Sequence, residues 1–228
     1  MKKAVFAVGR FQPPTIGHAL MIQEVMKYGG DAFLFVSSSS SPKAQNPLTV
    51  TQKITALKKM FPSGITFVDT ATCVPKCGGP VAANDYLRSL EYTDITLIAG
   101  SDRAPIFGPQ SDMWKTGIAN GIPPPNFKGL ERTTGVGATA MSGTKARQLA
   151  MDGNEAGFAD AVRVGAIDDA GIRELYDALR KTKKGGSEEE LTSFDADGGS
   201  RRSRRSTRRA LYSRRSRRKA TTRQSRRR

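Results

Sequence analysis

Apolar runs alternate with stretches of helical periodicity along the first 100 residues. Residues 4–8 form a continuous apolar run between charged residues and a glycine, which is typical of a strand buried on both faces. Residues 19–28 carry apolar side chains at helical spacing and are followed by Gly29 and Gly30, which end a helix. A second apolar run covers residues 32–36. This order predicts a strand, helix, strand unit with a right-handed parallel crossover.

The same alternation continues further along the chain. It predicts helices at 51–61, 81–90, 144–151, 158–164 and 169–181, and strands at 65–68 and 94–99. Residues 104–135 are rich in proline and glycine, and we expect an irregular excursion with a short strand near 130–134. Four strands alternating with helices predict an α/β fold with a doubly wound parallel sheet. Ligands bind such sheets at the carboxyl ends of the strands.

Composition changes sharply after residue 184. The 228 residues carry a formal net charge of +16 and are only 37% hydrophobic. Residues 201–228 hold 14 Arg and one Lys without an acid, which leaves 22 basic and 21 acidic side chains in the first 200 residues. We therefore expect a folded domain at 1–182, a flexible acidic linker at 183–200 and a disordered Arg/Ser-rich tail at 201–228.

The basic tail predicts non-specific binding to nucleic acid. So dense a run of cations neutralises phosphates without distinguishing bases, and its affinity should fall steeply with salt. The alternative is a solvated charge run without a partner. The arginines expected to contact phosphates are Arg201, Arg202, Arg204, Arg205, Arg208, Arg209, Arg214, Arg215, Arg217 and Arg218.

Metal binding and membrane insertion are not indicated. Cys73 and Cys77 lie close together, but with His18 as the only histidine they cannot complete the usual four-ligand zinc site. We expect free thiols in a reducing compartment, with a local disulfide as the alternative. The apolar run at the amino end is too short for a signal peptide, and no stretch approaches the length of a membrane span.

The turn after the first strand has the features of an anion-binding site. Gly9 ends the strand, and Thr15 can cap the following helix through its hydroxyl. Gly17 lets an anion approach the first helical turn, where unpaired N–H groups favour negative charge. His18 projects from that turn and can donate a hydrogen bond. The alternative is an ordinary helix start with an exposed Arg10.

A second segment, Met141–Arg147, has similar chemistry. Ser142 and Thr144 are helix-capping residue types, and Gly143 permits close approach of a ligand. Lys145 and Arg147 add positive charge. Taken alone, this segment also fits an ordinary capped helix with surface cations.

Together the two segments resemble the HIGH-type nucleotidyltransferase superfamily. In GRFQPPTIGH, Thr15, Gly17 and His18 match the Thr/His-x-Gly-His element that follows the first strand of a Rossmann-like sheet. MSGTKAR is similar to the Ser-Ser/Gly-Thr-x-x-Arg element that receives the triphosphate. The resemblance covers about residues 3–180 and implies a Rossmann-like doubly wound fold.

Further segments extend the resemblance. Residues 100–103 resemble the Gly-x-Asp turn that holds the nucleoside, where Asp102 would accept from ribose hydroxyls. Residues 41–48 resemble a loop of nucleotidyltransferase-like proteins of large double-stranded DNA phages and viruses, and Arg132 falls where those proteins carry an arginine. The chain departs from the family at Gln12, where Asn is common, and matches loosely at 104–135.

The resemblance implies an enzyme that transfers NMP from CTP or ATP to a small, phosphorylated acceptor with release of pyrophosphate. Mg²⁺ would be carried with the nucleotide, and no metal-binding residue is implied. The implied residues are His18, Lys145 and Arg147 for catalysis; Gly9, Arg10, Phe11, Thr15, Gly17, His18, Gly100, Asp102, Arg103, Ser142, Gly143 and Thr144 for the nucleotide; and Lys43 and Arg132 for the acceptor. Thr15, Ser142 and Thr144 would hold phosphates.

Other classes fit less well. No GxxxxGK[ST] or GxGxxG segment occurs in the sequence, which disfavours a kinase or a dehydrogenase. A tRNA-charging enzyme would need a longer chain and a KMSKS-like segment. The main alternative is a nucleic-acid-condensing or virion-associated protein that uses the fold as a scaffold. We expect a location in the cytoplasm or a nucleus-like compartment of a host cell, or in the virion, and the oligomeric state is left open.

Overall fold

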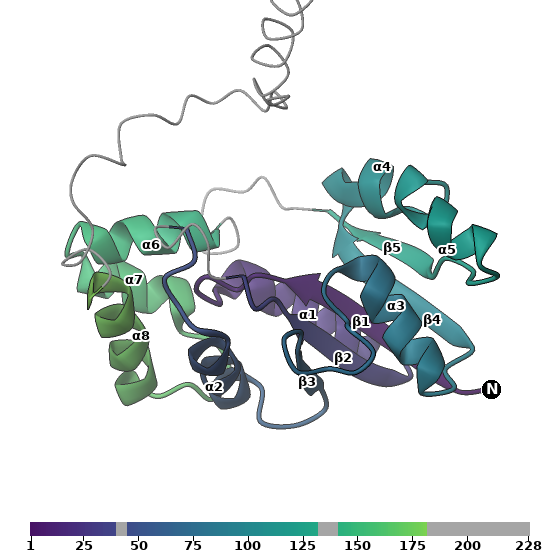
Figure 1. Ribbon diagram of the computed structural model, residues 1–228. Helices are drawn as coiled ribbons and strands as arrows, with labels where there is room; N and C mark the ends of the chain where they lie inside the picture. The colour runs from purple at the N-terminus through teal and green to yellow at the C-terminus, as the bar shows by residue number, and fades with distance from the viewer. Residues whose placement is uncertain (40–44, 132–140, 182–228) are drawn as a thin grey trace, which may run out of the picture. The chain divides into compact units, whose positions relative to one another are not determined.

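The computed structural model describes residues 1–39, 45–131 and 141–181 (Figure 1). The chain divides into two units, Met1–Gly186 and Ser187–Arg228, and all described residues belong to the first. Several expectations fall outside the described residues: the linker, the tail, Lys43 and Arg132.

Five parallel strands form one sheet in the order β3-β2-β1-β4-β5. They are β1 (Lys3–Gly9), β2 (Asp31–Val36), β3 (Thr66–Asp69), β4 (Asp94–Gly100) and β5 (Asn126–Leu130). Phe6 in β1 pairs with Phe33 on one side and Leu97 on the other. The predicted Rossmann-like α/β fold is confirmed, and the strand order reverses beside β1, where ligands bind in open α/β sheets.

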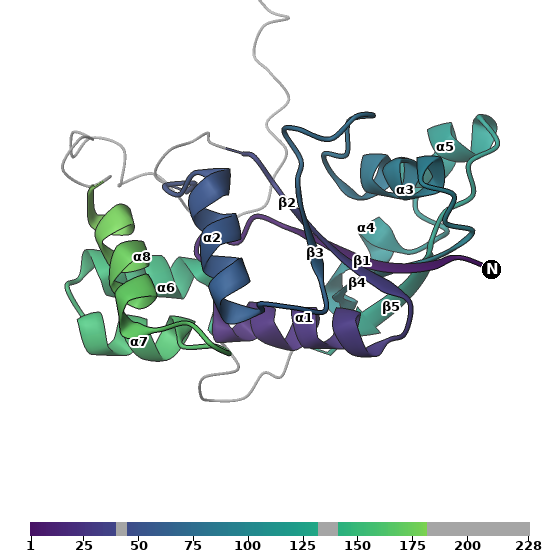
Figure 2. The same cartoon turned by 90° about the horizontal axis from the view of Figure 1, so that it is seen from below.

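Helices cover both faces of this sheet. The longer ones are α1 (Ile16–Lys27), α2 (Val50–Met60), α3 (Pro80–Ser89), α6 (Gly143–Met151), α7 (Glu155–Val162) and α8 (Asp169–Lys181). Figure 2 shows α1 and α3 on opposite sides of the strands. Within the described ranges, no helix is both long and apolar enough to span a bilayer.

Alternating side chains of β1 explain the two layers. Val5 and Ala7 pack into the core that also contains buried residues of α1, α2, α6, α7 and α8. Ala4 and Phe6 point to the opposite core, which α3 covers. All four side chains are fully buried, so the continuous apolar run at 4–8 reflects a central strand with helices on both faces.

The excursion before the last strand is more ordered than expected. It follows η1 (Ser101–Arg103) and contains α4 (Ala104–Phe107), η2 (Asp112–Trp114) and α5 (Lys115–Ala119). The ring of Trp114 is buried, and its Nε1 donates to the carbonyl of Gly108 at 3.0 Å. The strand expected near 130–134 falls mostly outside the described residues, and the described strand β5 lies before it, where Phe127 pairs with Leu97 of β4.

The two cysteines also differ from the expectation of free thiols. Cys73 and Cys77 form a disulfide in the loop between β3 and α3. Their Cα atoms lie 5.9 Å apart, inside the usual range for a disulfide. Cys77 is fully buried in the core beneath α3. The two cysteines are four positions apart, and the loop brings them close enough for the local disulfide that the sequence analysis gave as the alternative.

Candidate active site

The turn after β1 is built around a buried aromatic ring. Phe11 has a φ of 49° and is 1% exposed. A Cβ atom on Gly9 would lie 2.6 Å from this ring, so a glycine is needed there. The rings of Phe11 and His18 meet edge to face with centroids 5.1 Å apart. The ring of Phe11 thus lies in the core and supports His18, and the expected nucleotide contact of Phe11 stays a prediction.

His18 is oriented by the residue that precedes α1. The backbone N–H of Thr15 donates to Nδ1 of His18 over 3.1 Å. The hydroxyl of Thr15 also lies 2.9 Å from Nδ1, and which of these two atoms donates depends on the tautomer of the ring. Gly17 adds no side chain to this first turn of α1. His18 is thus held at Nδ1 by both polar groups of Thr15.

The two sequence motifs meet in space. The hydroxyl of Thr15 donates to the carbonyl of Met141 over 3.1 Å, across 126 positions of sequence. The guanidinium of Arg147 donates to the carbonyl of Gln12. A Cβ atom on Gly143 would lie 2.8 Å from that same carbonyl oxygen. We call the combined segments Gly9–His18 and Met141–Arg147 the phosphate cradle.

Thr15 joins the cradle rather than lining it. Its side chain is fully buried, and its hydroxyl donates to Met141. This hydroxyl also contacts Nδ1 of His18, and its expected contact with a phosphate stays a prediction. Its role is to bring the first turn of α1 against the segment that precedes α6.

The start of α6 presents polar groups at the surface. The hydroxyl of Ser142 accepts from the backbone N–H of Lys145 at 3.2 Å and caps the helix. Thr144 Oγ1 accepts from the guanidinium of Arg147 at 3.1 Å. Ser142, Thr144 and Lys145 are all exposed. The first turn of a helix favours anions, so these groups are suited to a phosphate ligand.

Two cations lie close together in the cradle. Burial lowers the pKa of Arg147, and the nearby positive charge of Arg10 lowers it further. In the described part of the chain, neither arginine pairs with a carboxylate. Like charges brought together without a counter-ion repel, and a polyanion between them would relieve the repulsion.

A turn at the end of β4 flanks the cradle. Gly100 ends this strand, and Asp102 and Arg103 follow in η1. β4 runs parallel to β1, so the turn lies at the same edge of the sheet as Gly9. The carboxylate of Asp102 lies 3.4 Å from Nε of Arg103, and both side chains are about half exposed.

Sequence reasoning assigned no role to Gln12, which the structure places at a junction. Its side-chain amide donates to the carbonyl of Leu48 at 2.8 Å and accepts from the N–H of Leu48 at 2.9 Å. Both residues are buried. This pair of bonds ties the cradle to the segment that leads into α2. No local pattern in the sequence indicates it.

Lys53 is a second residue that sequence reasoning missed. Its side chain is fully buried on α2, and its ammonium donates to the carbonyl of Ser37. Burial lowers the pKa of Lys53, while the carboxylate of Asp69 acts in the opposite direction. Spacing could have revealed it, because Lys53 lies three and four positions before the buried Ala56 and Leu57 on the same helical face.

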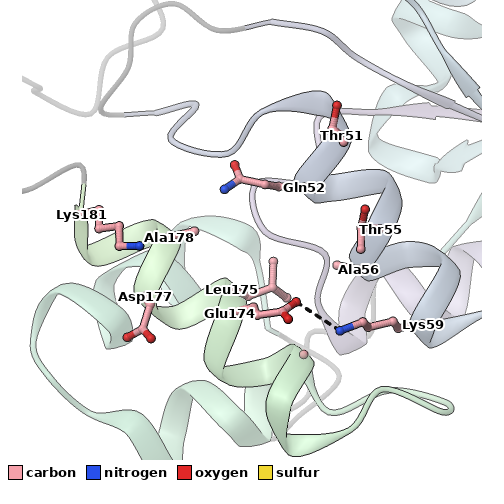
Figure 3. A pocket seen from close by; sticks show the side chains of 11 residues that line it. Thr51, Gln52, Thr55, Ala56, Lys59, Glu174, Leu175, Asp177, Ala178 and Lys181 are labelled. Atoms are coloured by element: carbon pink, nitrogen blue, oxygen red, sulfur yellow. Dashed lines mark hydrogen bonds and ion pairs between the residues drawn. The ribbon is translucent and has the colours of Figure 1, made fainter.

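A separate groove lies between α2 and α8 (Figure 3). It has a volume of about 390 Å³. Lys59 reaches across it to the carboxylate of Glu174 at 3.1 Å. The groove is lined by Thr51, Gln52, Thr55, Ala56, Lys59, Gly171, Glu174, Leu175, Asp177, Ala178 and Lys181. No cradle residue is among them, so the groove is not part of the candidate site.

Sequence comparison finds a family similar to the part of the chain that holds the cradle's first half. Residues 6–106 match the family model of cytidylyltransferase-like proteins. This part of the chain is similar to that family. The match contains both the turn after β1 and the turn after β4, and it confirms the expected nucleotidyltransferase class. No curated protein shows significant sequence similarity to the chain.

The chain is similar to two solved structures, and the first of them shows the same fold. One is a protein from Vibrio parahaemolyticus described as a nicotinate-nucleotide adenylyltransferase, with 14% identity and a TM-score of 0.51 over 77% of this chain and 99% of that chain. Another is the Plasmodium falciparum nicotinic acid mononucleotide adenylyltransferase complexed with APC, with 14% identity and a TM-score of 0.49 over 80% and 96% of the two chains.

Proposed function

We propose that this protein transfers NMP from CTP or ATP to a small phosphorylated acceptor. The observation that carries the proposal is the phosphate cradle. Two motifs far apart in sequence are joined by the Thr15 bond to Met141 and by the Arg147 bond to the carbonyl of Gln12, and the positive charge of Arg10 lowers the pKa of Arg147. A nucleoside triphosphate carries the negative charge that would offset the repulsion between these cations.

The proposed reaction is a displacement at the α-phosphorus. An oxygen of the acceptor forms the new bond to phosphorus, the bond to the bridging oxygen breaks, and pyrophosphate leaves with the electron pair. Transfers of this kind depend mainly on positioning and charge stabilisation. His18 would donate through Nε2 to a phosphate oxygen, while Lys145 and Arg147 would stabilise charge on the leaving pyrophosphate.

Other residues would hold the substrates. The first turn of α6, from Ser142 to Thr144, would bind phosphate oxygens, and Asp102 would accept from ribose hydroxyls. Lys43 and Arg132, which lie outside the described residues, are proposed to meet the acceptor. Mg²⁺ would arrive with the nucleotide, whose oxygens supply most of its ligands. In the described ranges, no group of three or more His, Cys, Asp or Glu is placed to hold a metal ion.

A nucleotide panel tests this proposal. With Mg²⁺ and saturating CTP or ATP, we expect the unfolding temperature of the full chain to rise, because a ligand at 100 times its Kd adds about 2.7 kcal/mol of stability. Pyrophosphate release is then measured with nicotinate mononucleotide, phosphocholine and 4-phosphopantetheine as acceptors. GTP and UTP serve as comparison nucleotides.

Two results would contradict the proposal. If no nucleotide raises the unfolding temperature, the proposed triphosphate site is contradicted. A shift without pyrophosphate release from any acceptor would favour the alternative, in which the fold is a scaffold for nucleic-acid binding.

We further propose that residues 201–228 bind nucleic acid through phosphates. The support is their composition of 14 Arg and one Lys without an acid. Binding of the full chain to random-sequence DNA and RNA should weaken about a thousandfold or more between about 50 and 200 mM salt. A chain truncated after residue 200 should not bind. Salt-independent binding, or equal binding by the truncated chain, would contradict a role for the tail.

A further inference from the structure

We propose that Lys53 is a positioning residue that holds the serine segment, Ser37–Ser39, against the end of β1, where the segment receives the acceptor. This inference rests on the function proposed above for the phosphate cradle. Lys53 does not contact the cradle itself, and it acts through the backbone of Ser37.

The contacts form a continuous path from α2 to the cradle. The buried ammonium of Lys53 donates to the carbonyl of Ser37. The N–H of Ser37 donates to the carbonyl of Gly9, the last residue of β1, at 2.9 Å. The next N–H, from Ser38, donates to the hydroxyl of Thr70 at 3.0 Å. The serine segment is thus anchored on three sides.

A lysine is a costly choice at this position. A buried ammonium loses its hydration, and burial accordingly lowers the pKa of Lys53. An apolar side chain of similar length, such as Met, would fill the same space without that cost. Unlike Met, the ammonium supplies a hydrogen-bond donor, and this donor reaches the Ser37 carbonyl from inside the protein. Costly buried groups of this kind concentrate at functional sites.

The location of the serine segment indicates which substrate it serves. The Gly100–Arg103 turn follows β4, and the serine segment follows β2, on the other side of β1. With the nucleoside at the β4 side and the triphosphate in the cradle, the β2 side is where an acceptor can approach the α-phosphorus. The segment offers hydroxyl groups there, and the Oγ atoms of Ser37 and Ser39 lie 2.8 Å apart.

The test compares Lys53→Met with Lys53→Arg and with the control Lys58→Met, which changes an exposed lysine of the same helix. Hydrogen exchange at the amides of residues 37–39 should be about tenfold faster or more in Lys53→Met. With nicotinate mononucleotide or 4-phosphopantetheine as acceptor probe, turnover at low acceptor concentration should fall about tenfold to a hundredfold. The stabilisation by Mg²⁺ and the nucleotide should stay unchanged.

The remaining readouts separate positioning from a general structural role. Lys53→Arg keeps a cationic donor and should restore part of the turnover, while Lys58→Met should resemble the unchanged chain. Equal exchange and an equal KM for the acceptor in Lys53→Met would overturn the inference. A parallel loss of nucleotide-induced stabilisation would also overturn it, because Lys53 would then support the whole site.

The inference can also be tested if Lys53→Met does not fold or if the proposed function fails. If Lys53→Met does not fold, Thr70→Val removes the hydroxyl that receives the N–H of Ser38 and should raise the acceptor KM in the same way; an unchanged KM would overturn the inference. If the unchanged chain neither binds a nucleotide nor releases pyrophosphate, the proposed function has failed. Hydrogen exchange alone then decides whether Lys53 holds the serine segment.

Discussion

His18→Ala lowers turnover about a hundredfold or more, which is the size expected for one lost transition-state donor. The structure explains why the effect should be on chemistry. The imidazole is held by Thr15 at Nδ1 and by the ring of Phe11, so its orientation at the start of α1 is fixed. Pyrophosphate release at saturating nucleotide and acceptor measures the change.

The fold should survive this substitution. The side chain of His18 lies in the first turn of α1, where alanine is a good helix former. His18→Gln, which keeps a side-chain N–H donor, should retain more activity than His18→Ala. Leu20→Ala, at an exposed position of the same helix, is the matched control. Unchanged turnover in a folded His18→Ala protein would remove His18 from the mechanism.

Gly143→Ala should lower kcat/KM by about a hundredfold, because a displacement of about 1 Å in a catalytic arrangement can cost that much. The added Cβ atom would lie 2.8 Å from the carbonyl oxygen of Gln12 and 3.2 Å from its carbonyl carbon. Both atoms are backbone, so the start of α6 must move away from the turn after β1. The phosphate cradle would then widen.

Helix propensity makes this prediction sharper. Alanine is more favourable than glycine by about 1 kcal/mol inside a helix, so propensity alone would stabilise the variant. The control is Gly78→Ala, where the new Cβ atom would meet nothing within 4 Å. The nucleotide-induced rise in unfolding temperature should shrink in Gly143→Ala and persist in Gly78→Ala. Normal activity and normal nucleotide stabilisation in Gly143→Ala would show that the close approach at Gln12 is not required.

The sequence alone predicted the elements that have a clear apolar pattern, either a continuous apolar run or a helical periodicity. The apolar runs at 4–8, 32–36 and 94–99 became β1, β2 and β4, because central strands of a covered sheet are apolar on both faces. Helical periodicity likewise placed α1 and α8 to within a few residues. The helix starts at the two cradle motifs were also visible, since capping residues and glycines precede α1 and α6.

Tertiary structure decided everything that depends on contacts between distant residues. β5 has only partly buried apolar positions, and its location follows from pairing with β4. Phe11 and Thr15 lie in a motif that suggests ligand contact, yet their side chains are used to join segments inside the protein. Lys53 carries a charge that its residue type assigns to solvent; its spacing places it on the apolar face of α2, and the packing of that face buries it. Local sequence records which face of an element is apolar, whereas the partner that covers that face is chosen only when the whole chain folds.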